Sequence, residues 1–265
     1  MTEPFIRLQG VRKVYRTGGK EFLAVSEVTF AVEAGALVTM VGPSGCGKST
    51  ILKILADLHP HDGGTVKIGN AANPFDPARD VGMVFQAALL LKWRRVIENV
   101  LLPAEILGLP IKASRERARD LLAMVGLAGF EEKYPYELSG GMQQRTAIAR
   151  ALIHDPKLVL MDEPFGALDA LTRAHLQDSV MEIHARLGNT VMMITHDVDE
   201  AVLLSDRVVM MTNGPSATIG EILDVRLPRP RRRLELATDS QYARCRAAVL
   251  EFLYARHRVP TRAAA

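Results

Sequence analysis

The stretch Gly42-Pro43-Ser44-Gly45-Cys46-Gly47-Lys48-Ser49-Thr50 decides the fold, because it fits the pattern G-x-x-x-x-G-K-[ST]. An apolar run at residues 36–41 precedes it, and a helical pattern at residues 51–56 follows it. Glycines let successive backbone N–H groups converge on an anion, and a helix that starts there adds its positive end. We therefore expect a phosphate-binding loop between a strand and a helix, with Lys48 at the β- and γ-phosphates and Ser49 on Mg²⁺. This arrangement predicts binding of a nucleoside triphosphate.

Length and composition indicate an ordinary globular protein. The chain has 265 residues, of which 24% are charged and 48% belong to the hydrophobic set. Its first residues contain no basic segment followed by an apolar one, so we expect no secretory signal. The apolar runs are far shorter than the roughly 20 residues that cross a membrane. Cys46 and Cys245 are far apart, which favours free thiols in a reducing compartment.

The net charge of +3 is distributed unevenly along the chain. Residues 226–265 carry ten arginines against three acidic residues, which gives +7 and leaves −4 for residues 1–225. This asymmetry disfavours a nucleic-acid binder with a basic surface throughout. The tail begins as a linker rich in proline and arginine, at residues 227–233, and continues as an amphipathic helix at residues 240–256. Its arginines fit either a solvated linker or a contact with anionic lipids.

Strand patterns occur at residues 6–15, 27–32, 65–69 and 80–86, and residues 87–137 are helical in pattern. We read these helices as a subdomain inserted into a sheet domain, with Ser114 as the N-cap of the second helix. Trp93 lies near the start of this insert, between Lys92 and Arg94. Exposed, it would suit a protein contact, and buried, it would be part of the core. Tyr15 ends the first strand, where its ring could stack on a nucleobase or simply pack.

Adjacent carboxylates follow a second buried strand. The apolar run at residues 158–161 ends in Asp162 and Glu163, and ligands bind at such strand ends in α/β sheets. Successive strand side chains point in opposite directions, so one carboxylate can assist Mg²⁺ while the other polarises a water. A further buried strand, residues 191–197, ends in His196. Because this strand would lie in the same sheet as Asp162 and Glu163, His196 could contact a phosphate.

A second helix start resembles an anion site. Residues 138–145 read Leu-Ser-Gly-Gly-Met-Gln-Gln-Arg, so that Ser139, Gly140 and Gly141 lead directly into a helix at residues 142–153. Taken alone, this sequence also fits an ordinary serine N-cap followed by glycines.

In this order, the loop at residues 42–50, Gln86, residues 138–145, residues 158–164, Asp169 and His196 resemble the ATP-binding subunit of an ABC transporter. The resemblance covers roughly residues 5–225. It implies an α/β fold: a P-loop ATPase core with an antiparallel β subdomain, an inserted helical subdomain (about 87–137) and a short C-terminal helical tail. The ATPase domain would be residues 1–225, followed by the linker and helix of residues 226–265.

The same resemblance assigns roles to individual residues. It makes residues 42–50 the Walker A motif for ATP and Tyr15 the aromatic residue that stacks on adenine. Gln86 would lie near Mg²⁺ and the attacking water, and Asp162 would be the Walker B ligand of that ion. Glu163 would be the general base, and His196 would contact the γ-phosphate. Residues 139–141 would close on ATP bound to a partner subunit, and Asp169 would lie at the dimer interface.

The resemblance also implies partners. Two such subunits, here a homodimer, would enclose two ATP molecules and work with transmembrane permease subunits and, indirectly, a solute-binding protein. The chain would then sit peripherally on the cytoplasmic face of the membrane, without nucleic acid. Residues 84–100 and 227–231 are similar to the nitrate/sulfonate/taurine importer group, although Lys92 replaces an expected proline.

Three other functions fit parts of the sequence. A lipid-trafficking or vitamin-precursor transporter would share every catalytic motif. A DNA-maintenance ATPase would need a long coiled-coil insert, and the stretch between residues 50 and 138 has no sustained heptads. A regulator that binds ATP without hydrolysing it would not need the Asp162–Glu163 pair.

Overall fold

The structure is a computed structural model that describes residues 3–71 and 73–257. These residues divide into two compact units, one formed by the described residues up to 73 together with 194–257 and the other by residues 74–193. The predicted boundaries of the ATPase domain and of the helical insert stay predictions. Within the described residues, no helix is both long enough and apolar enough to cross a membrane.

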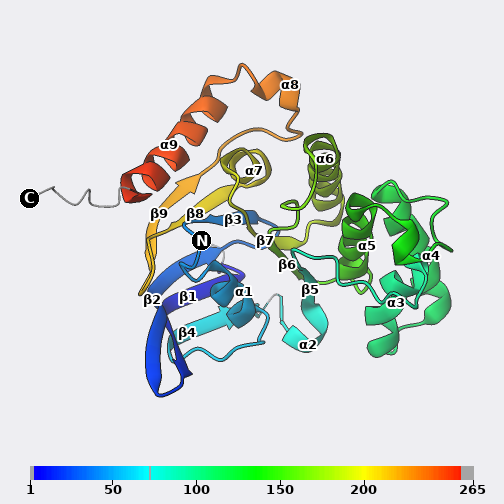
Figure 1. The fold of residues 1–265 in the computed structure, drawn as a ribbon, viewed down its shortest axis with the longest axis horizontal. Coiled ribbons are helices and arrows are strands. Elements are labelled where there is room, and N and C mark those ends of the chain that lie inside the picture. The colour runs from blue at the N-terminus through cyan, green and yellow to red at the C-terminus, as the bar shows by residue number, and fades with distance from the viewer. Residues whose placement is uncertain (1–2, 72, 258–265) are drawn as a thin grey trace, which may run out of the picture. The chain divides into compact units, whose positions relative to one another are not determined.

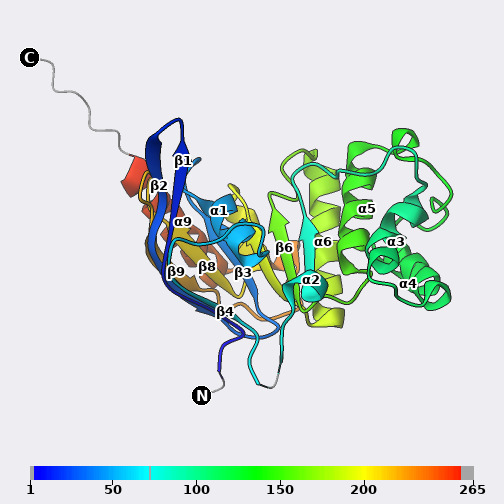
Figure 2. The ribbon, with the colours of Figure 1, turned by 90° about the horizontal axis from the view of Figure 1, so that it is seen from below.

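The first unit contains an antiparallel sheet with the strand order β2-β1-β4 (Figure 2). Its strands are β1 (Ile6–Thr17), β2 (Lys20–Val32) and β4 (Gly63–Ile68). Val28, Phe30 and Val32 of β2 are buried, because alternate side chains of a strand point to the same face. The strands predicted at residues 6–15, 27–32 and 65–69 are confirmed, and β2 begins earlier than expected.

A second set of strands in this unit leads to the glycine-rich loop. β3 (Leu37–Val41) pairs in parallel with β8 (Arg207–Met211), which pairs antiparallel with β9 (Ile219–Asp224). β3 is buried along its whole length, as a strand covered on both faces should be. The helices α1 (Lys48–Leu55) and α7 (Val198–Leu204) belong to the same unit. β9 was not expected from the sequence.

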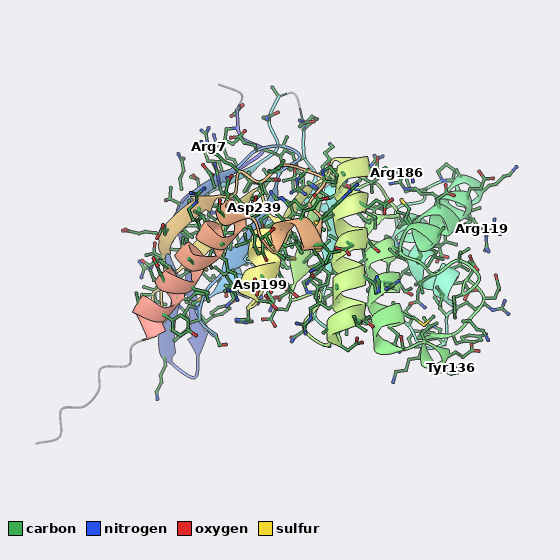
Figure 3. The ribbon with its side chains drawn as sticks, turned by 90° about the horizontal axis from the view of Figure 1, so that it is seen from above. Arg7, Arg119, Tyr136, Arg186, Asp199 and Asp239 are labelled. Atoms are coloured by element: carbon green, nitrogen blue, oxygen red, sulfur yellow. The ribbon has the colours of Figure 1, made fainter. Side chains whose placement is uncertain are left out.

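The C-terminal helices complete the first unit. α8 is Arg233–Leu236, and α9 (Ser240–His257) packs against α7 and β9 (Figure 1). Asp199 of α7, labelled beside α9 in Figure 3, accepts hydrogen bonds from Tyr242 Oη at 3.2 Å and from Arg246 Nε at 2.6 Å. Burial and the Asp199 charge raise the pKa of Tyr242 to about 12. The predicted tail helix is confirmed, and it is docked on α7 through these bonds.

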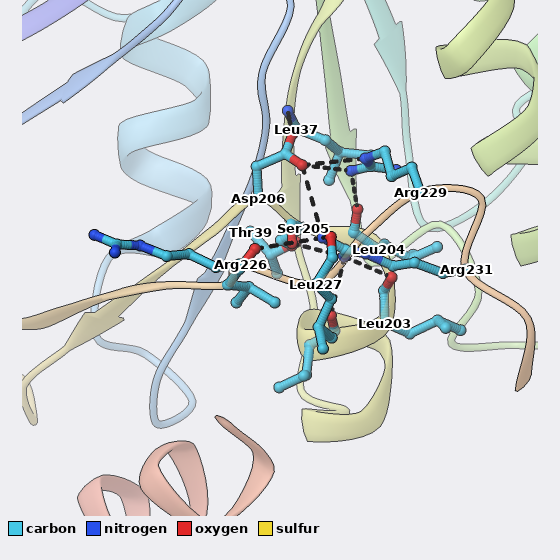
Figure 4. Close-up of polar contacts among 12 residues, drawn as sticks. Leu37, Thr39, Leu203, Leu204, Ser205, Asp206, Arg226, Leu227, Arg229 and Arg231 are labelled. Atoms are coloured by element: carbon cyan, nitrogen blue, oxygen red, sulfur yellow. Dashed lines mark hydrogen bonds and ion pairs between the residues drawn. The ribbon is translucent and has the colours of Figure 1, made fainter. Parts of the chain in front are cut away.

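The segment before α8 contradicts its prediction. Arg231 is only 6% exposed, and its guanidinium donates to five main-chain carbonyls, those of Val202, Leu203, Ser205, Val225 and Leu227 (Figure 4). Arg229 donates to the carbonyl of Leu204 at 2.8 Å and pairs with Asp206. The last carbonyls of a helix have no donors within the helix. At the end of α7, Arg229 and Arg231 supply these donors to the carbonyls of residues 202–205. Buried Arg231 is therefore not a solvated linker residue, and its guanidinium is not available to a lipid. Arg229 is exposed but bonded to the fold, and its contact with lipid stays a prediction.

In the second unit, β5 (Val81–Val84) pairs in parallel with β6 (Leu158–Asp162), and β6 lies between β5 and β7 (Thr190–Ile194). Its helices are α2 (Pro77–Asp80), α3 (Val96–Ile106), α4 (Ile111–Met124), a 3-10 turn (Pro135–Glu137), α5 (Gly140–Leu152) and α6 (Ala170–Leu187). α3, α4 and α5 pack together (Figure 2), and the apolar stripe of Leu121, Leu122 and Val125 is buried. The helical pattern predicted for this region is confirmed.

Two local predictions in this unit are resolved by the structure. Ser114 is not an N-cap, because α4 begins at Ile111 and the Ser114 N–H already donates to the Pro110 carbonyl, four residues earlier. Pro110 occupies the N-cap, where its fixed φ of −58° suits the approach to a helix. Trp93 is 74% exposed, which excludes the core position.

Candidate functional site

The glycine-rich loop connects β3 directly to α1, as predicted. Gly47 is the N-cap of α1 and has a φ of +94°, a conformation that residues with a side chain rarely adopt. A Cβ at Gly47 would lie 2.3 Å from Cγ1 of Val25. Only glycine fits there, so the loop can turn tightly against β2 and begin the helix at Lys48. The first turn of α1 then presents its backbone N–H groups toward the loop, which favours an anion.

Lys48 supplies the charge of this loop from a buried position. Its side chain is 6% exposed, and Nζ donates to the carbonyl of Gly42 at 2.8 Å and to that of Pro43 at 2.9 Å. Cys46 Sγ lies 3.8 Å from the same Nζ, and burial raises the pKa of this thiol. The ammonium is thus held by its own loop through groups that a bound phosphate chain can replace.

Tyr15 lies in the same unit and contacts the helix that follows the loop. Its hydroxyl is 3.3 Å from Thr50 Oγ1, and its ring meets His59 edge to face, with centroids 6.1 Å apart. The side chain is half-buried. The structure therefore joins Tyr15 to the phosphate loop, while its predicted stacking on adenine stays a prediction.

His196 also belongs to the first unit. β7 ends at Ile194, so His196 lies beyond the strand in which it was expected. The N–H of Thr195 donates to the Met40 carbonyl of β3 at 3.4 Å, and the Thr195 hydroxyl bonds buried Glu200 of α7. This anchor fixes the backbone that carries the exposed His196 imidazole next to the strand leading into the phosphate loop.

The acidic pair lies in the second unit, at the end of β6. Asp162 is the last residue of the strand, and Glu163 follows it with a φ of +47°. A non-glycine residue in this left-handed region is uncommon and is found disproportionately at functional sites. Oε2 of Glu163 lies 3.4 Å from Nε2 of exposed Gln86, so the structure brings these two predicted catalytic residues together.

The Ser-Gly-Gly sequence forms the start of α5. Ser139 is the N-cap, and its Oγ accepts a hydrogen bond from the Met142 N–H at 3.3 Å. Ser139 and Gly140 are exposed, whereas Gly141 is buried against α6. A Cβ at Gly141 would lie 2.5 Å from Cγ2 of Thr172, which explains the second glycine by close packing.

Asp169 is the N-cap of α6. Its Oδ1 accepts from the Thr172 N–H at 3.0 Å, and this bond lowers the pKa of Asp169. Its predicted place at a dimer interface is not tested by the single chain.

Two residues that position Gln86 were not identified from the sequence. Gln144, buried on α5, donates from Nε2 to the Phe85 carbonyl at 2.9 Å. Arg150 of the same helix donates to the carbonyls of Ala88 and Leu89 at 2.8 and 2.9 Å. α5 thus holds the main chain on both sides of Gln86. The helix also contains Gln143, Arg145 and Thr146, so no sequence pattern singles out these two residues.

The donor set predicted for Mg²⁺ consists of a hydroxyl, a carboxylate and an amide oxygen, from Ser49, Asp162 and Gln86. These are hard oxygen donors of the kind that Mg²⁺ binds. Among residues 3–71 and 73–257, no cluster of three or more His, Cys, Asp or Glu side chains forms a metal cage.

Comparison with known proteins identifies the family. Residues 25–166 match the family model described as "ABC transporter". The chain is 50% identical to the nitrate transport protein NasD of Klebsiella oxytoca, over 95% of this chain and 97% of that protein. It is 42% identical to the bicarbonate transport ATP-binding protein CmpD of Synechococcus elongatus, over 96% of this chain and 92% of that protein. It is 44% identical to the nitrate import ATP-binding protein NrtC of that organism but spans 39% of NrtC.

Solved structures agree with this result. A dimeric, post-hydrolysis state of the ATP-binding cassette MJ0796, bound to ADP and Pi, superposes with a TM-score of 0.73 at 32% identity, covering 84% of this chain and all of that one. The cbiO1 protein of Clostridium perfringens shares the fold, with a TM-score of 0.74 at 24% identity over 85% of this chain. The predicted α/β cassette fold is confirmed. The chain belongs to the ABC transporter family, as an ATP-hydrolysing subunit.

Proposed function

We propose that the chain powers an importer for a small inorganic anion, with nitrate as the first candidate. The observation that carries this proposal is the 50% identity to NasD, which extends over almost the full length of both proteins. Bicarbonate is the second candidate, because CmpD is 42% identical over a similar extent. These relatives favour an inorganic anion over the sulfonates, lipids or vitamin precursors that the sequence alone left open.

The first unit would hold the nucleotide. Residues 42–50 would bind the phosphates of ATP, with Lys48 giving up its bonds to the loop carbonyls for the β- and γ-phosphates. Tyr15 would stack on the adenine. His196 would donate a hydrogen bond to the γ-phosphate, from the backbone that Thr195 fixes on β3.

The second unit would supply the groups that activate water. Glu163 would accept the proton from the attacking water as it moves in line with the γ-phosphate. Gln86, whose Nε2 lies 3.4 Å from Glu163 Oε2, would orient that water. Ser49, Asp162 and Gln86 would hold Mg²⁺, and the bound ion would neutralise charge on the phosphate oxygens.

The exposed start of α5 would act on a second copy. In this proposal two chains form a homodimer, and Ser139, Gly140 and Gly141 of one chain contact the γ-phosphate held by the other. The N-cap position of Ser139 supports this role, because a helix start attracts an anion. Asp169 would lie at the interface between the two copies.

The chain would work at the cytoplasmic face of the membrane as a peripheral subunit, with permease subunits and an external solute-binding protein, and without nucleic acid. Residues 86–99 would dock a permease segment. The exposed apolar side chains of Leu89 and Trp93, at 60% and 74%, support a protein contact there.

Reconstitution tests the substrate. The complex would be purified from its native membrane in mild detergent and placed in vesicles with its solute-binding protein, and ATP turnover would be measured with nitrate, bicarbonate or taurine. We expect nitrate to stimulate turnover most. If only bicarbonate stimulated turnover, bicarbonate rather than nitrate would be the substrate. Recovery of the chain without any membrane protein would contradict the transporter assignment.

A matched pair of variants tests the chemistry. Glu163→Gln keeps the size and the Gln86 contact but cannot take a proton, so turnover should fall about 10²–10⁴-fold with ATP binding retained. Glu182→Gln, an exposed change of the same kind on α6, should leave turnover unaltered. A Glu163→Gln variant with most of its activity would remove Glu163 as the base.

A further inference from the structure

The strand that carries Tyr15 loses one of its two partners just before the tyrosine. β1 pairs with β2 through Tyr15, opposite Phe22, but its pairing with β4 ends at Arg12 and Gly63. A strand end paired on one edge only is held less firmly than one paired on both, because its second row of backbone groups lacks a ladder. The position of Tyr15 therefore depends on what replaces β4.

Asp62, the residue before β4, continues the pairing with its side chain. Its backbone N–H donates to the Arg12 carbonyl at 2.8 Å, and its Oδ2 accepts from the Val14 N–H, also at 2.8 Å. The carboxylate thus takes the place of the next strand residue and bonds the backbone directly before Tyr15. A charged acceptor makes this bond stronger than an ordinary ladder bond.

The same carboxylate holds a buried cation next to the tyrosine ring. Lys13 Nζ lies 3.1 Å from Asp62 Oδ2, and the lysine side chain is 9% exposed. The β1 register shifts between Lys13 and Val14, and Lys13 Nζ lies 5.7 Å from the centroid of the Tyr15 ring. Asp62 is itself partly exposed, with 27% of its side chain accessible, but without it the buried Lys13 ammonium would lose this counter-charge and would have to move toward water.

The far end of the ring is fixed by the phosphate-loop helix. Tyr15 Oη contacts Thr50 Oγ1 at 3.3 Å, and His59, which follows α1, meets the ring edge to face. The ring therefore has fixed contacts at its hydroxyl, on Lys13 and on His59. Asp62 holds Lys13 against the ring, and it also fixes the backbone at Val14, which positions the Tyr15 side chain.

We propose that Asp62 is a positioning residue for the nucleobase: its carboxylate fixes Val14 and Lys13 so that the Tyr15 ring is held ready for adenine. This inference rests on the proposed stacking of Tyr15. Asp62 touches neither nucleotide nor reacting atoms, and it acts through the tyrosine. Its effect should therefore depend on the base of the ligand and not on its phosphates.

The test compares two ligands that share the phosphate site. Binding of ADP and of inorganic pyrophosphate, in the same magnesium buffer, would be measured on the full chain for the wild type, Asp62→Ala, Asp62→Asn, Tyr15→Ala and the double variant Asp62→Ala/Tyr15→Ala. Asp57→Asn is the matched control, because it removes the same charge at an exposed position near the end of α1.

We expect Asp62→Ala to weaken ADP about fivefold to tenfold and to change pyrophosphate less than about twofold. Asp62→Asn, which keeps an acceptor for Val14, should show a smaller loss and covers the case in which the alanine variant does not fold. In the Tyr15→Ala background the Asp62 change should have no further effect on ADP, and Asp57→Asn should behave as the wild type.

Other results would overturn the inference. Equal weakening of both ligands would show a general structural role, and effects of Asp62→Ala and Tyr15→Ala that multiply in the double variant would show independent action. If Tyr15→Ala lost ADP affinity but neither Asp62 variant did, the positioning role of Asp62 would be rejected, while the adenine contact of Tyr15 would stand. If Tyr15→Ala itself left ADP binding intact, the proposed adenine contact would fail first and the inference with it.

Discussion

Lys48 and Arg231 are equally buried cations of the first unit, and they differ in what holds them. Each is 6% exposed. The Lys48 ammonium donates to carbonyls no more than six residues away, in its own loop. The Arg231 guanidinium donates to five carbonyls, and the most distant in sequence, that of Val202, is 29 residues away (Figure 4).

This difference separates a ligand-binding charge from a structural one. An ammonium on a flexible stem can turn from loop carbonyls to phosphate oxygens, because water or the ligand can satisfy the loop. A planar guanidinium bound to five carbonyls has no such freedom, and it satisfies the end of α7 together with Arg229. Burial of a charged side chain therefore does not by itself identify a ligand-binding site. What distinguishes the two residues is whether the carbonyls they bond belong to one local loop or to distant parts of the chain.

The largest expected effect is on catalysis at Lys48. Lys48→Ala removes the cation next to the β- and γ-phosphates, so steady-state ATP turnover should fall at least ~100-fold. Its free energy of unfolding in urea should change by less than about 1 kcal/mol, because removing a buried charge offsets the lost hydrogen bonds. Unchanged turnover would contradict the role of the loop.

Arg231→Met should give the opposite pattern. The apolar side chain keeps much of the volume but leaves buried carbonyls without donors, so we expect a loss of about 2–4 kcal/mol in unfolding free energy. ADP affinity of the folded protein should stay within about twofold of the wild type. Stability equal to the wild type in urea titration would show that α7 does not need this cap.

Arg229→Ala should have a smaller effect of the same kind. Arg229 is partly exposed, at 28% for its side chain, and Asp206 keeps its bond to the Leu37 N–H at 2.9 Å when Arg229 is removed. The expected loss is about 1 kcal/mol. A thermal melt that ranks Arg229→Ala below Arg231→Met in stability would reverse the proposed order of the two caps.

The smallest expected effect is a pH dependence of stability that comes from the carboxylate of Asp62. The pKa of Asp62 is lowered from its ordinary 3.8, first by the Val14 N–H bond and then by Lys13. An acid with a lower pKa in the folded state stabilises the fold above its unfolded pKa, and this contribution is lost as pH falls through the folded value. The difference in melting temperature between wild type and Asp62→Asn should therefore be constant from about pH 5 to pH 7 and shrink below about pH 4. A difference that does not vary with pH would exclude the charge as its cause.

The sequence predicted the parts of the molecule that depend on local spacing. The phosphate loop needs glycines and a lysine within nine residues, and the acidic pair needs only a buried strand before it. The bonds of Arg231 and Asp62 join positions far apart along the chain, and no local pattern encodes which carbonyl or N–H they reach. β9 was missed because only its register on β8 distinguishes it from a loop.

The prediction of Ser114 as an N-cap was wrong for a different reason. Serine is a good N-cap, but Pro110 lies four residues earlier and is also suited to a helix start. Two start signals compete there, and α4 begins at the first of them, directly after Pro110. Its additional residues, 111–113, are exposed, so packing does not explain the earlier start.

One experiment tests the central contrast directly: thermal unfolding of the wild type, Lys48→Ala and Arg231→Met, each with and without saturating ADP and Mg²⁺. A ligand that binds only the folded state raises the melting temperature. We predict that Lys48→Ala melts like the wild type without ligand and gains nothing from ADP, whereas Arg231→Met melts lower and gains as much as the wild type. The reverse pattern, with a destabilised Lys48→Ala that still responds to ADP, would contradict the account.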